Sequence, residues 1–139
     1  MKVLADTCAW SLLLRRKTRA ALRSDEQFIL ASLKDAIRDG RVVLIGPIRQ
    51  EVLSGIQAQA QFEELRNSLA AFADEPLTTG HFEEAARLLN LCRSRGVECG
   101  STDILICAIA FQMHYDILTY DQGMKRCIEV LRIEGLLHQ

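Results

Sequence analysis

Near its start, the chain has a short apolar run that ends abruptly in a carboxylate. Residues 2–7 are Lys-Val-Leu-Ala-Asp-Thr, and a helix-like segment follows at once. Consecutive apolar residues without polar alternation are typical of a strand that is buried on both faces of a parallel sheet. Groups just beyond the carboxyl end of such a strand border the crevice in which open α/β sheets bind ligands. Asp6 is therefore expected to lie in a ligand-binding crevice.

Two later segments are also short apolar runs. Residues 41–46 (RVVLIG) and 116–119 (DILT) are the second and third candidates for buried strands. Capping residues and helical spacing predict helices over 7–14, 24–39, 48–55, 57–72, 81–95 and 103–113, a helical turn at 124–126, a weak edge strand at 75–77 and a last strand at 130–133. Strands that alternate with helices predict one α/β domain over residues 1–139, with a mainly parallel sheet.

The composition is that of an ordinary globular domain. Apolar residues make up 49% of the 139 residues and charged residues 25%, and a chain of this length can bury a core without staples. Aromatic residues make up only 6%, so base stacking on an aromatic platform is not expected to be the main means of binding nucleic acid. The formal net charge of −1 excludes neither nucleic acid nor an acidic ligand.

The cysteines and the apolar runs indicate the cellular compartment of the protein. The five cysteines form no C-x-x-C pair, their number is odd, and the N-terminus runs into the first strand without a signal peptide. Cys8 and Cys107 lie in apolar helical patterns and are most simply small core residues. No apolar run reaches the roughly 18 residues of a membrane span. We therefore expect a cytoplasmic protein in a reducing environment, with no membrane contact.

Basic residues are concentrated after the first expected helix. Five of the 17 fall within nine positions, at Arg15, Arg16, Lys17, Arg19 and Arg23. A solvated helix end explains such a cluster as well as a surface that binds phosphates or an acidic partner does. Both explanations stay open.

Four acidic residues stand where a solvated charge is not expected. Asp6 and Asp121 follow buried strands. Glu51 lies on the helix after the second strand, and Asp103 opens a strongly apolar helix. All four positions are near the carboxyl edge of the expected sheet, so they can converge on one crevice. Converging carboxylates repel one another unless they are protonated or bind a cation, and their oxygens suit Mg²⁺ or Mn²⁺.

Taken singly, each acid also has a structural explanation. Asp103 can stabilise the start of a helix through the helix dipole, and Asp121 can be a turn residue. Such explanations become weaker for four acids that are placed alike. Zinc chemistry is not indicated, because the three histidines are widely scattered and no histidine or cysteine set has zinc spacing.

At these residues the chain resembles PIN-domain ribonucleases, and most closely the VapC-like toxins of toxin–antitoxin modules. The matching pieces follow one another in the family's order and cover essentially the whole chain: residues 4–10 (LADTCAW), 51–55 (EVLSG), 102–110 (TDILICAIA) and 118–121 (LTYD). Each piece alone is weak, but the four together at these separations are fairly specific. Family members often carry another acid and an aromatic just after the last aspartate, whereas residues 122–124 are Gln-Gly-Met here.

The resemblance implies a three-layer α/β/α fold with a parallel sheet of about five strands. It also implies a site in which Asp6, Glu51, Asp103 and Asp121 hold one or two Mg²⁺ or Mn²⁺ ions. Thr7 and Thr119 match hydroxyl positions beside these acids, where they can orient a carboxylate or a water. Residues 122–124 lack the additional acid that family members often carry there, so the resemblance leaves the second metal ion open.

The activity implied by the resemblance is metal-dependent hydrolysis of RNA phosphodiester bonds, which leaves a 5′-phosphate and a 3′-hydroxyl. The implied partners are an RNA substrate, a small antitoxin that blocks the acidic groove, and a second copy of the chain in a homodimer. The RNA target and the number of metal ions stay open, as does whether Trp10 packs in the core or at a subunit contact.

Three alternatives remain. A non-catalytic RNA- or partner-binding module on the same fold would be marked by the loss of a site acid, and all four are present. A phosphatase or phosphotransferase with an aspartyl nucleophile commonly has a second Asp two residues after the first, where this chain has Cys8. A DNA-acting nuclease with the same metal chemistry is the third, and the small size favours RNA by analogy only.

Overall fold

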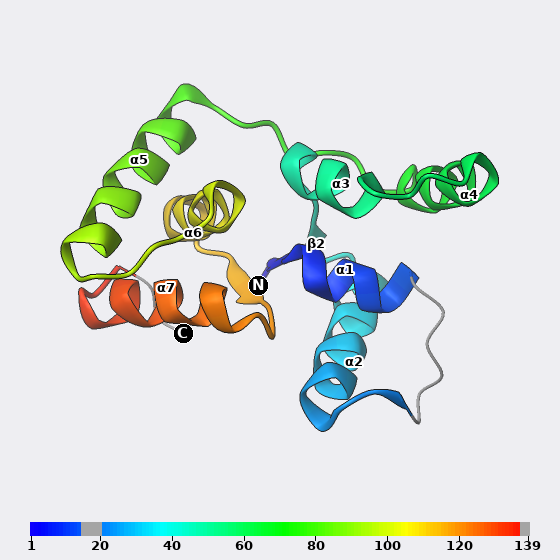
Figure 1. The fold of residues 1–139 in the computed structure, drawn as a ribbon, viewed down its shortest axis with the longest axis horizontal. Coiled ribbons are helices and arrows are strands. Elements are labelled where there is room, and N and C mark those ends of the chain that lie inside the picture. The colour runs from blue at the N-terminus through cyan, green and yellow to red at the C-terminus, as the bar shows by residue number, and fades with distance from the viewer. Residues whose placement is uncertain (15–20, 137–139) are drawn as a thin grey trace.

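Three parallel strands form the sheet. In a computed structural model that describes residues 1–14 and 21–136, β1 (Val3–Ala5) lies between β2 (Val42–Val43) and β3 (Asp116–Leu118) (Figure 1). The helices in the described ranges are α1 (Thr7–Leu14), α2 (Ser24–Arg38), α3 (Gly46–Leu53), α4 (Gln59–Leu69), α5 (Thr79–Ser94), α6 (Ser101–Met113) and α7 (Gln122–Ile133). The expected α/β architecture with a parallel sheet is confirmed.

The register of the strands brings their carboxyl ends to one edge. Leu4 lies opposite Val43 on one side and Ile117 on the other. The backbone N–H of Asp6 continues this ladder by donating to the carbonyl oxygen of Leu118 at 2.9 Å. All three residues of β1 are buried, as expected for a central strand of a parallel sheet.

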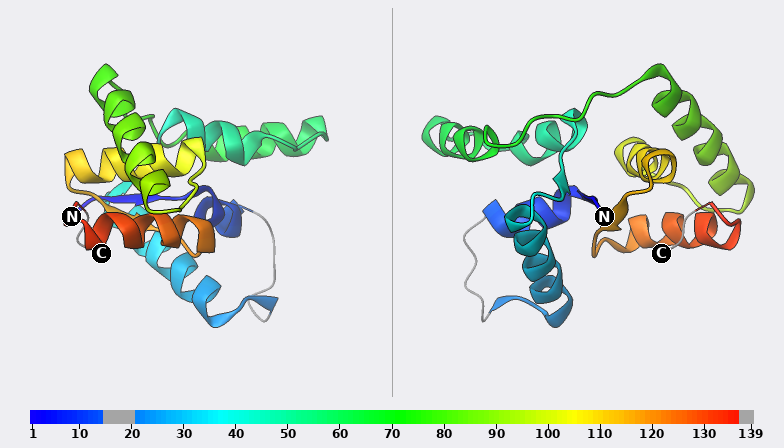
Figure 2. Two further views of the ribbon diagram at one scale, coloured as in Figure 1. Left: turned by 60° about the vertical axis from the view of Figure 1, so that its left-hand side comes forward. Right: turned by 180° about the vertical axis from the view of Figure 1, so that it is seen from behind.

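Helices cover both faces of the sheet. In the left view of Figure 2, α6 lies on one side of the strands, and α2 and α7 lie on the other. The α3–α4 pair extends away from the sheet in Figure 1 and in both views of Figure 2. The sheet and its covering helices therefore hold the core, whereas α4 packs mainly against α3.

The core is built on α6 and on the aromatic residue of α1. Residues 104–110 of α6 are all buried, as their unbroken apolar sequence predicts. Trp10 is fully buried, and its ring lies 5.0 Å from that of Phe72 in an edge-on arrangement. Trp10 is thus a core residue, which answers the question that the sequence left open.

The prediction of about five strands is wrong for the described residues, which contain three. Residues 130–133 are not a strand but the last residues of α7, because Met124, Cys127 and Leu131 share one buried helical face. The expected edge strand at 75–77 is reduced to a single parallel bridge between Leu44 and Asp74. Pro76 follows at once and has no N–H with which to extend the ladder.

A disulfide that the cysteine spacing does not predict joins two segments near the sheet edge. Cys99 of the loop before α6 is bonded to Cys127 of α7. Cys92 and Cys107 are free and buried, and the prediction that Cys107 is a small core residue is confirmed. The pair links the segment before Asp103 to the helix that follows Asp121.

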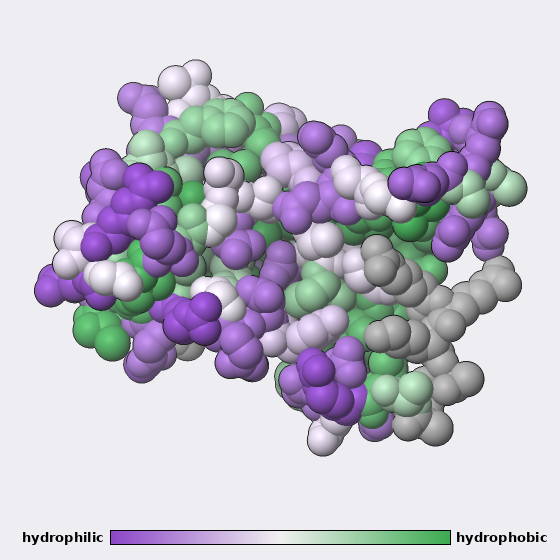
Figure 3. Space-filling model, in the orientation of Figure 1, coloured by the Kyte–Doolittle hydropathy of each residue, from purple (hydrophilic) through white to green (hydrophobic). Residues whose placement is uncertain are grey.

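The face of the molecule seen in Figure 3 is mostly hydrophilic. Hydrophobic areas also reach this face, one of them over the upper end of α5. Within residues 1–14 and 21–136, no helix has the length and apolar character needed to cross a membrane.

Candidate metal centre

A cavity of about 290 Å³ lies at the carboxyl edge of the sheet, and the four predicted acids border it. Each acid lies in or directly after a different strand or helix. Asp6 follows β1, Asp121 follows β3, Glu51 lies in α3, and Asp103 lies in the first turn of α6. Thr7 and Cys8 complete the lining. The structure therefore brings Asp6, Glu51, Asp103 and Asp121 together, as their positions in the sequence predict.

Asp6 is the most buried of the four, with 5% of its surface exposed. One carboxylate oxygen, Oδ1, accepts the backbone N–H of Thr7 at 2.7 Å, and the other, Oδ2, accepts the hydroxyl of Thr119 at 2.8 Å. Burial raises the pKa of Asp6, these two hydrogen bonds oppose that rise, and the charges of Asp121 and Glu51 add to it. Asp6 is thus held rigidly but at an electrostatic cost.

Thr119 connects Asp6 with Asp121. Its hydroxyl donates to Asp6 and accepts the backbone N–H of Asp121 at 3.0 Å, and it is buried, with 8% exposed. The predicted proximity of Thr119 to the acids is therefore present. Thr7 differs, because its backbone rather than its hydroxyl contacts Asp6, and its buried Oγ1 has no hydrogen-bond partner among the described residues.

Asp121 caps the helix that follows it. Its Oδ2 accepts the backbone N–H of Met124 at 2.8 Å, in the usual manner of an Asp at a helix N-cap. Its side chain is exposed, as is that of Glu51. The turn explanation for Asp121 is thus correct as local structure, and it is compatible with the place of this carboxylate on the cavity wall.

Asp103 is the acid whose ionised form is opposed both by burial and by the charges of the other three acids. Its carboxylate accepts no hydrogen bond from any residue in the described ranges. Burial, followed by the charges of Asp6, Asp121 and Glu51, raises its pKa from 3.8 to about 6. A carboxyl group with that pKa is partly protonated at mildly acidic pH, and a bound cation would reverse the shift.

Cys8 is the cavity residue that the sequence did not assign to the site. Its thiol sulfur lies 3.8 Å from Asp6 Oδ2 and 3.5 Å from Thr119 Oγ1. Burial raises the pKa of the thiol, so it stays protonated at neutral pH. Its position two residues after Asp6, on the first turn of α1, is the signal from which it could have been found.

The donor chemistry of this cavity fits a hard divalent cation. Four carboxylates supply the oxygen ligands that Mg²⁺ and Mn²⁺ prefer. A bound cation would offset both the burial and the neighbouring charges that raise the pKa of Asp103. Among the residues that the structure describes, no three His, Cys, Asp or Glu side chains form a ready metal-binding group. The acids thus border one space without being drawn together as a closed ligand set.

The basic cluster lies largely outside the described residues, since Arg15, Arg16, Lys17 and Arg19 fall in 15–20. Its described member, Arg23, is ion-paired with Asp25 at 3.1 Å. Its guanidinium also lies 5.5 Å from the ring centre of Tyr120, the residue before Asp121.

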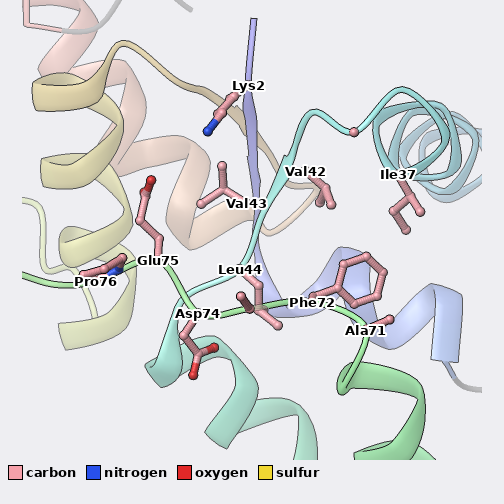
Figure 4. Close-up of a pocket in the computed structure, with 12 residues that line it drawn as sticks. Lys2, Ile37, Val42, Val43, Leu44, Ala71, Phe72, Asp74, Glu75 and Pro76 are labelled. Carbon is pink, nitrogen blue, oxygen red and sulfur yellow. The ribbon is translucent and has the colours of Figure 1, made fainter.

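A second cavity, of about 400 Å³, differs in character (Figure 4). It lies beside β2 and the segment 71–76, and Lys2 borders it at the amino end of β1. Apolar side chains, among them Ile37, Val42 and Phe72, make much of its wall. It has no group of convergent acids, so the smaller cavity is the candidate site.

Two comparisons with known proteins found matches to this chain. A chain in the crystal structure of FitAcB from Neisseria gonorrhoeae has a similar fold, with a TM-score of 0.70, 19% sequence identity, and coverage of 90% of this chain and 91% of that chain. A comparison of the sequence with curated proteins found no match. The family model described as PIN domain matches residues 3–129. The chain therefore belongs to the PIN-domain family.

Proposed function

We propose that this protein is a Mg²⁺- or Mn²⁺-dependent endoribonuclease, the toxin of a toxin–antitoxin module. The observation that carries the proposal is the arrangement of Asp6, Glu51, Asp103 and Asp121 around one cavity at the carboxyl edge of the sheet. Membership of the PIN-domain family supports it, because members of this family are typically metal-dependent nucleases. The reaction is hydrolysis of an RNA phosphodiester bond.

The four acids would hold the metal ion, each in a different setting. Asp6 is fixed by the hydroxyl of Thr119 and the N–H of Thr7, so it would be the least mobile ligand. Asp103 would lose its raised pKa when the cation arrives, so metal binding and proton release would be coupled. A divalent ion bound there would stabilise the negative charge that develops on the phosphate and would acidify a water molecule.

The exposed carboxylate of Glu51 is the best placed to accept the proton of the attacking water. It lies on the cavity wall, and no hydrogen bond or ion pair to a described residue occupies it. The water oxygen bonds to phosphorus while the bond from phosphorus to the 3′ oxygen breaks. The products, by likeness to the family, carry a 5′-phosphate and a 3′-hydroxyl.

The partners follow from family likeness and are part of the proposal. A small antitoxin would cover the acidic cavity, and two copies of the chain would form a homodimer. Asp6, Asp103 and the other acids are all retained, which favours a nuclease over a non-catalytic binding module on the same fold. RNA is preferred over DNA by analogy.

The test is a cleavage assay on structured RNA with and without Mg²⁺ or Mn²⁺. Asp6→Asn and Asp103→Asn proteins should lose metal-dependent cleavage and remain folded. Asp35→Asn is the matched control, because Asp35 is an exposed acid on α2 that pairs with Arg38, and it should cleave like the parent protein. Full activity of Asp6→Asn would contradict the site assignment, and inactivity of well-folded parent protein toward every RNA would favour the binding module.

A further inference from the structure

Within the described ranges, one arginine stands apart from the others. The other nine are each ion-paired with a carboxylate, from Arg23 with Asp25 to Arg132 with Glu129. Arg126, on the second turn of α7, forms no ion pair or hydrogen bond with any described residue. Its guanidinium therefore has no direct carboxylate partner among the described residues.

This arginine lies close to Asp121, one of the acids that line the cavity. A Cβ placed on Gly123 would lie 3.1 Å from Asp121 Oδ2 and 3.7 Å from Arg126 Nη2, so the cavity acid and the guanidinium face the same small space. Any other residue at position 123 would partly fill that space. Glycine is among the least favourable residues within a helix, so helix stability does not explain its presence in the first turn of α7.

Asp121 lies near Arg126 without forming an ion pair with it. Its Oδ2 caps the N–H of Met124 and lines the cavity, and no ion pair joins it to the guanidinium. The four acids make the approach to the cavity unfavourable for a polyanion. A cation beside one of these acids would attract a phosphate to the cavity and so counteract the repulsion.

We propose that Arg126 binds a phosphate of the RNA strand that lies across the acidic cavity. Its guanidinium would donate to non-bridging phosphate oxygens through the space left open at Gly123. A planar guanidinium suits a phosphate because it offers two parallel N–H donors. The inference rests on the proposed nuclease function and deepens it by naming a substrate-binding residue.

The experiment measures the salt dependence of RNA binding. Labelled single-stranded RNA of mixed sequence is titrated with the full chain carrying Asp6→Asn, so that the probe is not cleaved, alone and combined with Arg126→Gln or Arg126→Lys. Lys2→Gln is the matched control. Lys2 is also exposed and without an ion pair to a described residue, but it lies at the amino end of β1. Cleavage kinetics with Mg²⁺ are measured for the same substitutions in the active protein.

The logarithm of the observed RNA-binding constant, Kobs, falls linearly with the logarithm of the salt concentration. Loss of one phosphate contact makes this slope less steep by about 0.7 for a single strand. Arg126→Gln should make the slope less steep by this amount. It should also raise KM about three- to tenfold, the effect expected when a charge-assisted hydrogen bond screened by water is lost. Arg126→Lys should keep the slope, because it keeps the charge, and Lys2→Gln should leave both quantities unchanged.

The outcomes separate this inference from the proposed function. If the parent protein cleaves RNA but Arg126→Gln keeps its slope and KM, Arg126 does not bind the phosphate and the nuclease proposal stands. A fall in kcat with unchanged slope and KM also overturns the inference, because it indicates a structural role. If the parent protein neither binds nor cleaves RNA, the proposed function and the inference fail together.

Discussion

Replacing Asp103 by asparagine should stabilise the metal-free protein, and the gain should depend on pH. Asp103 is the acid to change because its carboxylate has no hydrogen bond to lose, whereas Asp6 accepts two. Its pKa is raised from 3.8 to about 6, so the folded state holds this proton more tightly than the unfolded chain does. Folding stability is therefore lost as pH rises from about 4 through 6, and the full penalty is present above that range.

The size of the effect follows from the shift. At about 1.4 kcal/mol per pKa unit, a rise of about two units corresponds to at most about 3 kcal/mol. Asp103 is only partly buried, so water screens part of this penalty, and the start of α6 favours a negative charge by up to about 1 kcal/mol. Asp103→Asn should therefore raise the free energy of unfolding by about 1–2 kcal/mol at neutral pH, or Tm by about 3–6 °C.

Urea unfolding of both proteins in chelator, near pH 8 and near pH 4, measures this difference. The gain should be present at the higher pH and absent at the lower, where the carboxyl is protonated in both states. Added Mg²⁺ should stabilise the parent protein and have a smaller effect on Asp103→Asn. An Asp103→Asn protein that is no more stable than the parent near pH 8 would refute the claim that burial and the neighbouring acids make the ionised form of Asp103 costly.

The remaining predictions concern the hydrogen bonds, the disulfide and α7. Thr119→Val keeps the shape of the side chain but removes the hydroxyl that donates to Asp6 Oδ2, so it should cost about 1–3 kcal/mol of stability in chemical unfolding, whereas Thr119→Ser should cost less. Cys127→Ser should cost about 3 kcal/mol relative to the oxidised protein, as expected for a loop of this length, and its Tm should no longer respond to a thiol reductant. Leu131→Ala should cost about 2–5 kcal/mol and Ile133→Ala less than about 0.5 kcal/mol, because Leu131 is fully buried and Ile133 is 69% exposed. Similar losses of stability at positions 131 and 133 would favour a strand over residues 130–133, because side chains two positions apart lie on the same face of a strand.

The site was easier to predict than the sheet. Parallel strands meet at one edge, so a carboxylate after β1 and another after β3 must be neighbours whatever the details of packing. The helix over residues 7–14 also follows from local sequence signals. These features depend on local signals within each element and on the general rule for parallel strands.

The features that sequence reasoning missed depend on distant partners. A short apolar run such as 130–133 fits a strand or a buried helix face equally well, and only the packing of Leu131 decides between them. Pairing of Cys99 with Cys127 requires two segments separated by 28 positions to meet. Burial of Cys8 beside Thr119 likewise depends on the contact between β1 and β3.

The central place of β1 has a consequence for motion. Its backbone is paired with neighbours on both sides, so its amides should exchange with solvent only when the whole sheet opens. Helix α4, which packs mainly on α3, should exchange much earlier by local opening. Asp6 directly follows this slowly exchanging strand. The projecting helix α4 can therefore open and close many times while the backbone that carries Asp6 stays closed.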